Sequence, residues 1–281
     1  MIKFGHSVFA LPFALLATFL AARPGLPNAT QLTLILICMV GARSAAMTFN
    51  RIVDARIDAA NPRTANRPLP RGQITTGAAW AFFFGACTLF LIGCAGFLFS
   101  QANPWPLRLA VPVLLWLCFY SYTKRFTRWS HLVLGVGIAF SPVAAWIAIN
   151  PATLGAPAWL LLIAVAFWIA GFDLIYACQD VEFDRAQGLR SVPAQMGVPA
   201  ALGLARAFHA VTVIALLGVG HTADLGALYY IGVGCATVLL VIENAIISPR
   251  DLSRVNLAFF TVNGIVGLVL GALGVLDVVL S

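Results

Sequence analysis

The stretch from Ala158 to Asp184, AWLLLIAVAFWIAGFDLIYACQDVEFD, decides the class of fold. Between Ala158 and Cys178, Asp173 is the one charged residue, and the others are apolar, small or aromatic. A helix rises about 1.5 Å per residue, so about 20 such residues cross the roughly 30 Å hydrocarbon layer of a bilayer. A helix also satisfies its own backbone polar groups inside lipid. The stretch therefore predicts a membrane-spanning helix with an acidic side chain inside the span.

The composition of the whole chain indicates that its solvent is lipid. Of its 281 residues, 61% are hydrophobic and 10% are charged, whereas about a quarter of the residues of a soluble domain are charged. Nine apolar stretches can be marked: Phe4–Ala22, Leu32–Phe49, Gly77–Phe99, Leu107–Tyr122, Leu132–Ile149, Ala158–Cys178, Ala200–Val219, Leu225–Ile247 and Val255–Leu280. The sequence therefore predicts an all-α, polytopic membrane protein with nine transmembrane helices.

The distribution of basic residues predicts the orientation in the membrane. With the N-terminus in the cytoplasm, the inner segments carry thirteen Lys and Arg residues and the outer segments carry two, Arg23 and Arg108. Cytoplasmic loops are rich in such residues, so we predict a multi-pass protein of the inner (plasma) membrane with a cytoplasmic N-terminus. The first stretch could instead be a signal peptide, but the charge pattern favours its retention. The net charge of +7 has the same explanation and does not indicate nucleic-acid binding.

Two groups of polar residues follow the second and sixth stretches. They are Asn50, Asp54 and Asp58, and then Asp180 and Asp184. Steps of four residues place side chains on one face of a helix, where like charges repel. A divalent cation removes this repulsion, and Mg²⁺ prefers carboxylate oxygens together with substrate phosphates. We therefore predict that all five residues bind magnesium around a diphosphate. The alternative is that the aspartates only form ion pairs with nearby arginines.

The spacing of these groups also indicates an internal repeat. The two groups lie four predicted spans apart and share the same four-residue step. We therefore predict one transmembrane domain, residues 1–281, built from two related four-helix halves and a ninth helix.

Asp173 lies inside the sixth stretch, and Tyr176 follows it by about one helical turn. An acid within a span is a functional candidate by default. We predict a catalytic role for both residues, in which Asp173 positions the acceptor or receives its proton. The alternative is that Asp173 is a buried hydrogen-bond partner of Tyr176 or of another helix.

Basic residues on the same predicted membrane face indicate a diphosphate site. Arg63 and Arg67 lie in a proline-rich loop after the second stretch, and Lys124 and Arg125 follow the fourth. Arginine and lysine suit phosphate oxygens. We predict that these four residues bind the diphosphate and that Lys124 also assists its departure. The alternative is that they are ordinary charges of cytoplasmic loops.

Arg43 is a basic residue within the second stretch, seven residues before Asn50. An arginine at that depth needs an anionic partner. We predict that Arg43 binds the carboxylate of an aromatic acid, although the diphosphate or an internal acid such as Asp173 could serve instead.

The histidines show no ligand spacing, and no role is predicted for them: His6, His131, His209 and His221.

With these residues, the sequence resembles the UbiA superfamily of intramembrane prenyltransferases over essentially the whole chain. The motifs that carry the resemblance are Asn50-x3-Asp54-x3-Asp58, Asn66-Arg67-Pro68-Leu69-Pro70, Tyr120-x3-Lys124 and Asp173-x6-Asp180-x3-Asp184. One departure is Arg51, which stands where many members have an aspartate. The resemblance implies nine helices around a central cavity, magnesium dependence, and a cytoplasmic-side active site that opens laterally to lipid.

Within the superfamily, the sequence is most similar to bacterial 4-hydroxybenzoate polyprenyltransferases. Five runs carry this likeness: GARSAAMTFNR (41–51), FYSYTKRFT (119–127), GFDLIYACQDVEFDR (171–185), SPRDLSR (248–254) and NLAFFTVNG (256–264). The likeness implies transfer of a polyprenyl group from its diphosphate to a hydroxylated aromatic acid in ubiquinone or menaquinone biosynthesis. It also implies magnesium-assisted departure of the diphosphate and electrophilic substitution of the ring.

The acceptor implied first is 4-hydroxybenzoate, and the alternative is a dihydroxynaphthoate of menaquinone biosynthesis. A secondary transporter is the alternative from another class, since such proteins also combine repeats with charges inside spans. Transporter sites lie near the middle of the membrane, whereas most charges here lie at one predicted face. The length of the prenyl chain, the proton acceptor and the oligomeric state are not predicted.

Overall fold

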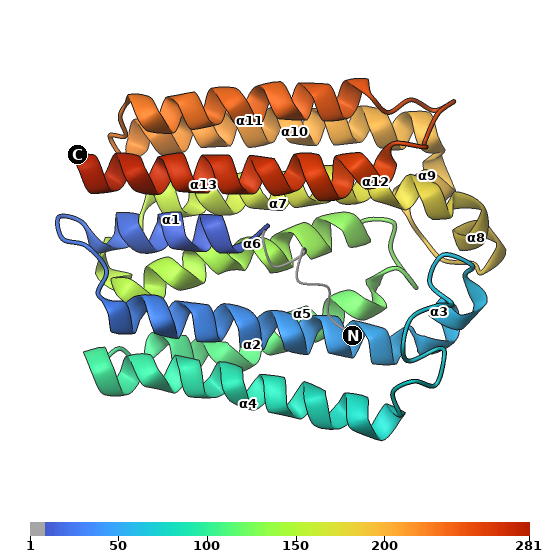
Figure 1. Ribbon diagram of the computed structural model, residues 1–281, viewed down its shortest axis with the longest axis horizontal. Coiled ribbons are helices and arrows are strands. Elements are labelled where there is room, and N and C mark those ends of the chain that lie inside the picture. The colour runs from blue at the N-terminus through green and yellow to red at the C-terminus, as the bar shows by residue number, and fades with distance from the viewer. Residues whose placement is uncertain (1–8) are drawn as a thin grey trace. The chain divides into compact units, whose positions relative to one another are not determined.

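A computed structural model describes residues 9–281 as helices joined by loops, of which the longest lies between α3 and α4 (Figure 1). Of residues 9–281, 79% are helical, and the only β-type pairing among them is an isolated bridge between Ser248 and Asp251. In this described part of the chain, eight helices are long and apolar enough to cross a membrane, and Leu11–Ala22 is a shorter apolar helix. The prediction of an all-α, polytopic membrane protein is confirmed. The predicted start of the first span, at Phe4, lies outside the described residues.

The chain forms two compact units, of which one contains residues 29–123. Its helices are α2 (Ala29–Val53), α3 (Ala55–Ala60), α4 (Thr76–Gln101) and α5 (Trp105–Thr123). Helix α2 packs against both α4 and α5. Gly41 permits the close approach of α2 to α4, because a Cβ there would lie 2.7 Å from the backbone nitrogen of Phe90. Small residues at such crossings let membrane helices pack closely.

The other unit contains the described residues 9–28 together with residues 124–281. Its elements are α1 (Leu11–Ala22), α6 (Ser130–Ile149), η2 (Pro151–Thr153), α7 (Ala156–Ala177), η3 (Cys178–Asp180), α8 (Val181–Ala186), α9 (Val192–Met196), α10 (Val198–Thr222), α11 (Ala227–Ala245), α12 (Val255–Leu257), the π-helical η4 (Ala258–Val262) and α13 (Asn263–Leu280).

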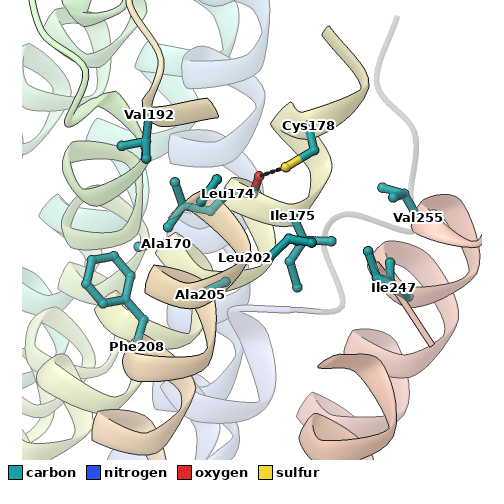
Figure 2. Packing of buried hydrophobic residues seen from close by; sticks show 12 residues of the cluster. Ala170, Leu174, Ile175, Cys178, Val192, Leu202, Ala205, Phe208, Ile247 and Val255 are labelled. Atoms are coloured by element: carbon teal, nitrogen blue, oxygen red, sulfur yellow. Dashed lines mark hydrogen bonds between the residues drawn. The ribbon is translucent and has the colours of Figure 1, made fainter. Parts of the chain in front are cut away.

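Helix α7 is the core of this unit. It packs against α1, α6 and α10, and its apolar side chains are largely buried. Figure 2 shows Leu174 and Ile175 of α7 gathered with Leu202 of α10 and with Ile247 and Val255 in one buried cluster. The acidic side chain of α7 is therefore carried by a helix that is fixed by apolar packing on several sides.

Helix α6 approaches α7 closely at Gly135. A Cβ at this position would overlap the carbonyl oxygen of Ala166 and lie 3.2 Å from the backbone nitrogen of Ala170. The two backbones can therefore pack this closely only because residue 135 has no side chain. The contact fixes which residues of α6 face α7.

A buried polar network connects α7, α11 and the start of α13. Trp168 Nε1 donates a hydrogen bond to Asn263 Oδ1, and Asn263 Nδ2 donates one to Glu243 Oε1, both at 2.7 Å. The same amide also donates to the carbonyl oxygen of Ala258, in the π-helical turn, at 3.0 Å. Hydrogen bonds of this kind are expected for buried polar groups, and they hold the π-helical turn in place.

Candidate active site

Asp54 and Asp180 have nearly the same backbone conformation. Asp54 stands between α2 and α3 with φ −92° and ψ 5°. Asp180 stands immediately before α8 with φ −104° and ψ 7°. These angles lie in the sparsely populated bridge region, where many active-site residues are found. Each aspartate therefore marks a break before a six-residue helix: Asp54 lies between α2 and α3, and Asp180 ends the 3-10 turn η3 that separates α7 from α8.

A second aspartate follows each break by four residues. The backbone nitrogen of Asp58 donates to the carbonyl oxygen of Asp54 at 2.7 Å, so the helical turn continues through the break. Asp184 lies in the first turn of α8. In each unit, a step of four residues keeps the pair on one side of the turn. The internal repeat stays a prediction.

In the unit of residues 29–123, the predicted metal ligands already have partners. Asn50 Nδ2 donates to Asp54 Oδ2 at 3.1 Å. Asp58 is buried, and Arg67 Nη1 lies 2.6 Å from both of its carboxylate oxygens. Arg51 Nη1 lies 3.7 Å from Asp58 Oδ2. Arg67, which was predicted to bind the diphosphate, is therefore the counter-ion of Asp58 in this structure.

The loop after α3 holds the other arginine predicted to bind the diphosphate. The backbone nitrogen of Arg63 donates to Asn61 Oδ1 at 2.9 Å, a turn that an asparagine side chain commonly stabilises. Thr64 Oγ1 donates to the carbonyl oxygen of Asp58 at 3.0 Å. These bonds keep the arginine-bearing loop close to the end of α3.

In the other unit, the segment after α8 is tied to the segment that bears Lys124 and Arg125. The backbone nitrogen of Arg190 donates to the carbonyl oxygen of Lys124 at 2.7 Å, and its side chain donates to the carbonyl oxygen of Phe126 at 3.0 Å. Asp184 accepts a hydrogen bond from Ser191 Oγ at 2.8 Å and interacts electrostatically with Lys124. A predicted phosphate-binding lysine therefore lies near a predicted metal ligand.

Asp173 of α7 is paired with a histidine. His131 Nδ1 lies 2.7 Å from Asp173 Oδ2. The ring of Tyr176 packs on Phe259, with centroids 4.2 Å apart. No role was predicted for His131, because 42 residues separate it from Asp173 and no sequence spacing signals the contact. The one feature of the sequence that indicated a role for His131 was its position directly before the predicted span Leu132–Ile149.

Arg43 lies within α2 and is partly buried. Within residues 9–281, its buried Nε has no hydrogen-bond partner. A buried donor without a partner is costly and rare. Such a donor suits an anionic ligand, as predicted for the carboxylate of an aromatic acid.

The donor atoms of the aspartate pairs fit magnesium. Among the side chains of residues 9–281, no group of three or more His, Cys, Asp and Glu residues is arranged to hold a metal ion. Mg²⁺ usually takes one or two carboxylates and fills its other positions with water and substrate phosphate. Two carboxylates and an amide oxygen near the end of α2, and two carboxylates at α8, are ligands of that type. The residues therefore fit an ion that shares its coordination with a phosphate group.

Comparisons with known sequences point to one family. The profile of the UbiA prenyltransferase family matches residues 10–265. The 4-hydroxybenzoate octaprenyltransferase of Aeromonas hydrophila subsp. hydrophila is 32% identical over 247 residues, which cover 88% of this chain and 83% of that protein. The protein of the same name from Pseudoalteromonas translucida is 30% identical over 253 residues, which cover 88% and 82% of the two chains.

Solved structures show the same fold. The apo structure of a UbiA homolog from Aeropyrum pernix K1 has a TM-score of 0.87 and 30% identity, with 99% of each chain covered. A UbiA homolog from Archaeoglobus fulgidus, solved bound to DMAPP and Mg²⁺, has a TM-score of 0.74 and 20% identity, with 98% of this chain and 96% of that one covered. The second likeness shows the fold alone.

Proposed function

Because the chain belongs to the UbiA prenyltransferase family, we propose that it transfers a polyprenyl group from its diphosphate to a hydroxylated aromatic carboxylic acid. The observation that carries the proposal is the pair of aspartates at each helix break, Asp54 with Asp58 and Asp180 with Asp184. The relatives named 4-hydroxybenzoate octaprenyltransferase favour 4-hydroxybenzoate as the acceptor.

The proposed binding of the donor uses the two aspartate pairs. Asn50, Asp54, Asp58, Asp180 and Asp184 would hold magnesium, which supplies positive charge to the diphosphate oxygens. The Archaeoglobus fulgidus homolog, which shares the fold, was solved with DMAPP and Mg²⁺. Asp58 would then exchange its contact with Arg67 for the ion, which releases the guanidinium to bind phosphate oxygens.

The proposed chemistry is an electrophilic substitution of the ring. The bond between the prenyl carbon and the diphosphate oxygen breaks, and its electron pair leaves with the diphosphate. Lys124, Arg63, Arg67 and Arg125 stabilise the charge that develops on this leaving group. The ring carbon beside the phenol oxygen bonds to the prenyl carbon. The ring then loses its proton to Asp173, and the electrons of that C–H bond restore aromaticity.

Tyr176 has a positioning role in this proposal. Its ring packs on Phe259, and the residue lies one turn from Asp173 on the same helix. Aromatic contacts of this type fix ring orientation. Tyr176 would therefore form part of the wall against which the aromatic acceptor lies.

The site is proposed to lie at the cytoplasmic face of the inner membrane. The basis is the excess of Lys and Arg in the segments that also carry the aspartate pairs. In this orientation the N-terminus is cytoplasmic, the diphosphate is held at the polar end, and the prenyl tail lies among apolar side chains.

Arg43→Ala tests the recognition of the acid. We expect the KM for the aromatic acid to rise about 10- to 100-fold, because a charge-assisted hydrogen bond to the carboxylate is lost. The KM for the prenyl diphosphate should change less than about threefold. Steady-state kinetics with each substrate varied in turn measures both values. An unchanged KM for the acid would remove Arg43 from this role.

The proposed function is tested with membranes that contain the enzyme. A labelled prenyl diphosphate is offered with 4-hydroxybenzoate or with a dihydroxynaphthoate, in the presence of Mg²⁺ or of a chelator. Product from 4-hydroxybenzoate supports the proposal, and product from the dihydroxynaphthoate alone would change the acceptor. If reconstituted vesicles accumulate an acid without forming product, the protein is a transporter and the proposal is wrong.

A further inference from the structure

A buried histidine supports the acid that lies inside the membrane-spanning part of α7. His131 is 5% exposed, and its Nδ1 lies 2.7 Å from Asp173 Oδ2. Within residues 9–281, its other ring nitrogen, Nε2, is buried without a hydrogen-bond partner. A buried polar atom without a partner is unusual, and the contact with Asp173 is the one hydrogen bond that the His131 side chain makes within residues 9–281.

The packing of α6 on α7 produces this contact. His131 lies in the first turn of α6, and Gly135 follows it by one turn on the same face. Gly135 lies against the backbone of Ala166 and Ala170. Asp173 follows Ala166 by seven residues and therefore shares its face of α7. The same helix contact that needs a glycine thus sets His131 beside Asp173.

The burial of the two side chains shows which one a ligand can reach. The Asp173 side chain is 21% exposed and the His131 side chain is 7% exposed. An ionised carboxylate only accepts hydrogen bonds, so His131 donates through Nδ1–H. Asp173 is the accessible member of the pair, and His131 stands behind it.

We propose that His131 is a positioning residue for prenyl transfer. It donates Nδ1–H to Oδ2 of Asp173 and so presents Oδ1, for which no partner is found within residues 9–281. Oδ1 then receives the proton that the aromatic acceptor releases, and the electrons of the broken C–H bond return to the acceptor ring. This inference rests on the proposed function, because it assumes that Asp173 receives that proton.

A set of four variants of the full-length enzyme tests the proposal. They are His131→Leu, which removes the donor, His131→Asn, whose side-chain N–H can replace Nδ1–H, Asp173→Asn, and the double variant His131→Leu/Asp173→Asn. His221→Leu is the matched control, because His221 is exposed near the end of α10. Each purified protein is assayed with both substrates varied, and its thermal unfolding is recorded.

The expected results separate positioning from packing. His131→Leu should lower kcat about 10- to 100-fold, the effect of one hydrogen bond to a charged group, with the KM for the prenyl diphosphate nearly unchanged. His131→Asn should recover to within about threefold of the wild type because the donor is restored. The double variant should be no slower than Asp173→Asn, because residues that act as one unit are not additive. His221→Leu should match the wild type.

Three outcomes would overturn the proposal. They are a normal kcat in His131→Leu, a failure of His131→Asn to recover although it unfolds at the wild-type temperature, and additive losses in the double variant. If His131→Leu does not fold, the double variant that contains it is not used, and the turnover of His131→Asn, which keeps a donor at this position, decides the question. A wild-type enzyme that transfers no prenyl group to either acid would instead refute the proposed function, and the inference would fall with it.

Discussion

Asp180→Asn and Asp54→Asn are each expected to lower the rate of prenyl transfer by about 10³-fold, since a metal ion stabilises the transition state by several kcal/mol. Asparagine keeps the size of the side chain but lacks the charge that holds magnesium. Both residues stand at helix breaks with bridge-region angles, and asparagine tolerates such angles well. The variants should therefore fold and insert while the chemistry fails.

The measurement is the release of prenylated product by purified variants at saturating magnesium. Asp224→Asn is the matched control, because Asp224 is exposed and has φ 48°, a left-handed conformation that asparagine also adopts. This control should keep wild-type turnover. Near-normal turnover in Asp180→Asn or Asp54→Asn would count against a metal-bound diphosphate.

Gly135→Ala is expected to destabilise the protein by about 3 kcal/mol, the upper end of the usual cost of overpacking. The added Cβ would overlap the carbonyl oxygen of Ala166, and a backbone atom cannot move aside as a side chain can. Helices α6 and α7 must then separate. Turnover should fall together with stability, because the contact between His131 and Asp173 depends on this packing.

Unfolding followed by tryptophan fluorescence in detergent measures the loss. Gly203→Ala in α10 is the control, because Gly203 is exposed and an added Cβ would meet nothing within 4 Å. It should be neutral or stabilising by up to about 1 kcal/mol, since alanine favours helix over glycine. If Gly135→Ala unfolds at the same point as Gly203→Ala, the tight crossing of α6 and α7 does not limit stability.

The positions of most helices could be predicted from the lengths of the apolar stretches in the sequence. The predicted span Leu107–Tyr122 contains Pro112, yet α5 runs from Trp105 to Thr123. Neighbouring helices can satisfy the backbone group that a proline frees in a membrane helix. The sixth span, predicted to end at Cys178, ends as α7 at Ala177. Hydropathy determines where such helices lie because an unsatisfied backbone in lipid is too costly.

The details of the candidate site were less accessible from the sequence. Four-residue spacing predicted one continuous face for Asn50, Asp54 and Asp58, but the helix breaks at Asp54 while its backbone bonds continue. Four-residue spacing alone does not distinguish a continuous helix from one that breaks at Asp54. The pairing of Asp58 with Arg67 depends on how the loop after α3 folds back. The pairing of Asp173 with His131 depends on a helix crossing, which single-sequence periodicity does not contain.

The π-helical turn Ala258–Val262 sets the orientation of the last helix. A π-helical turn holds an extra residue, so everything after it is rotated by about 100° relative to an uninterrupted α-helix. In this orientation a Cβ at Gly271 would overlap Pro12 of α1, and one at Gly274 would lie 3.0 Å from Leu16 Cδ1. Loss of one residue from the turn would rotate both glycines away from α1 and place bulkier side chains of α13 in the close contact between the two helices. The number of residues in the π-helical turn, as much as their identity, therefore determines which face of α13 packs against α1.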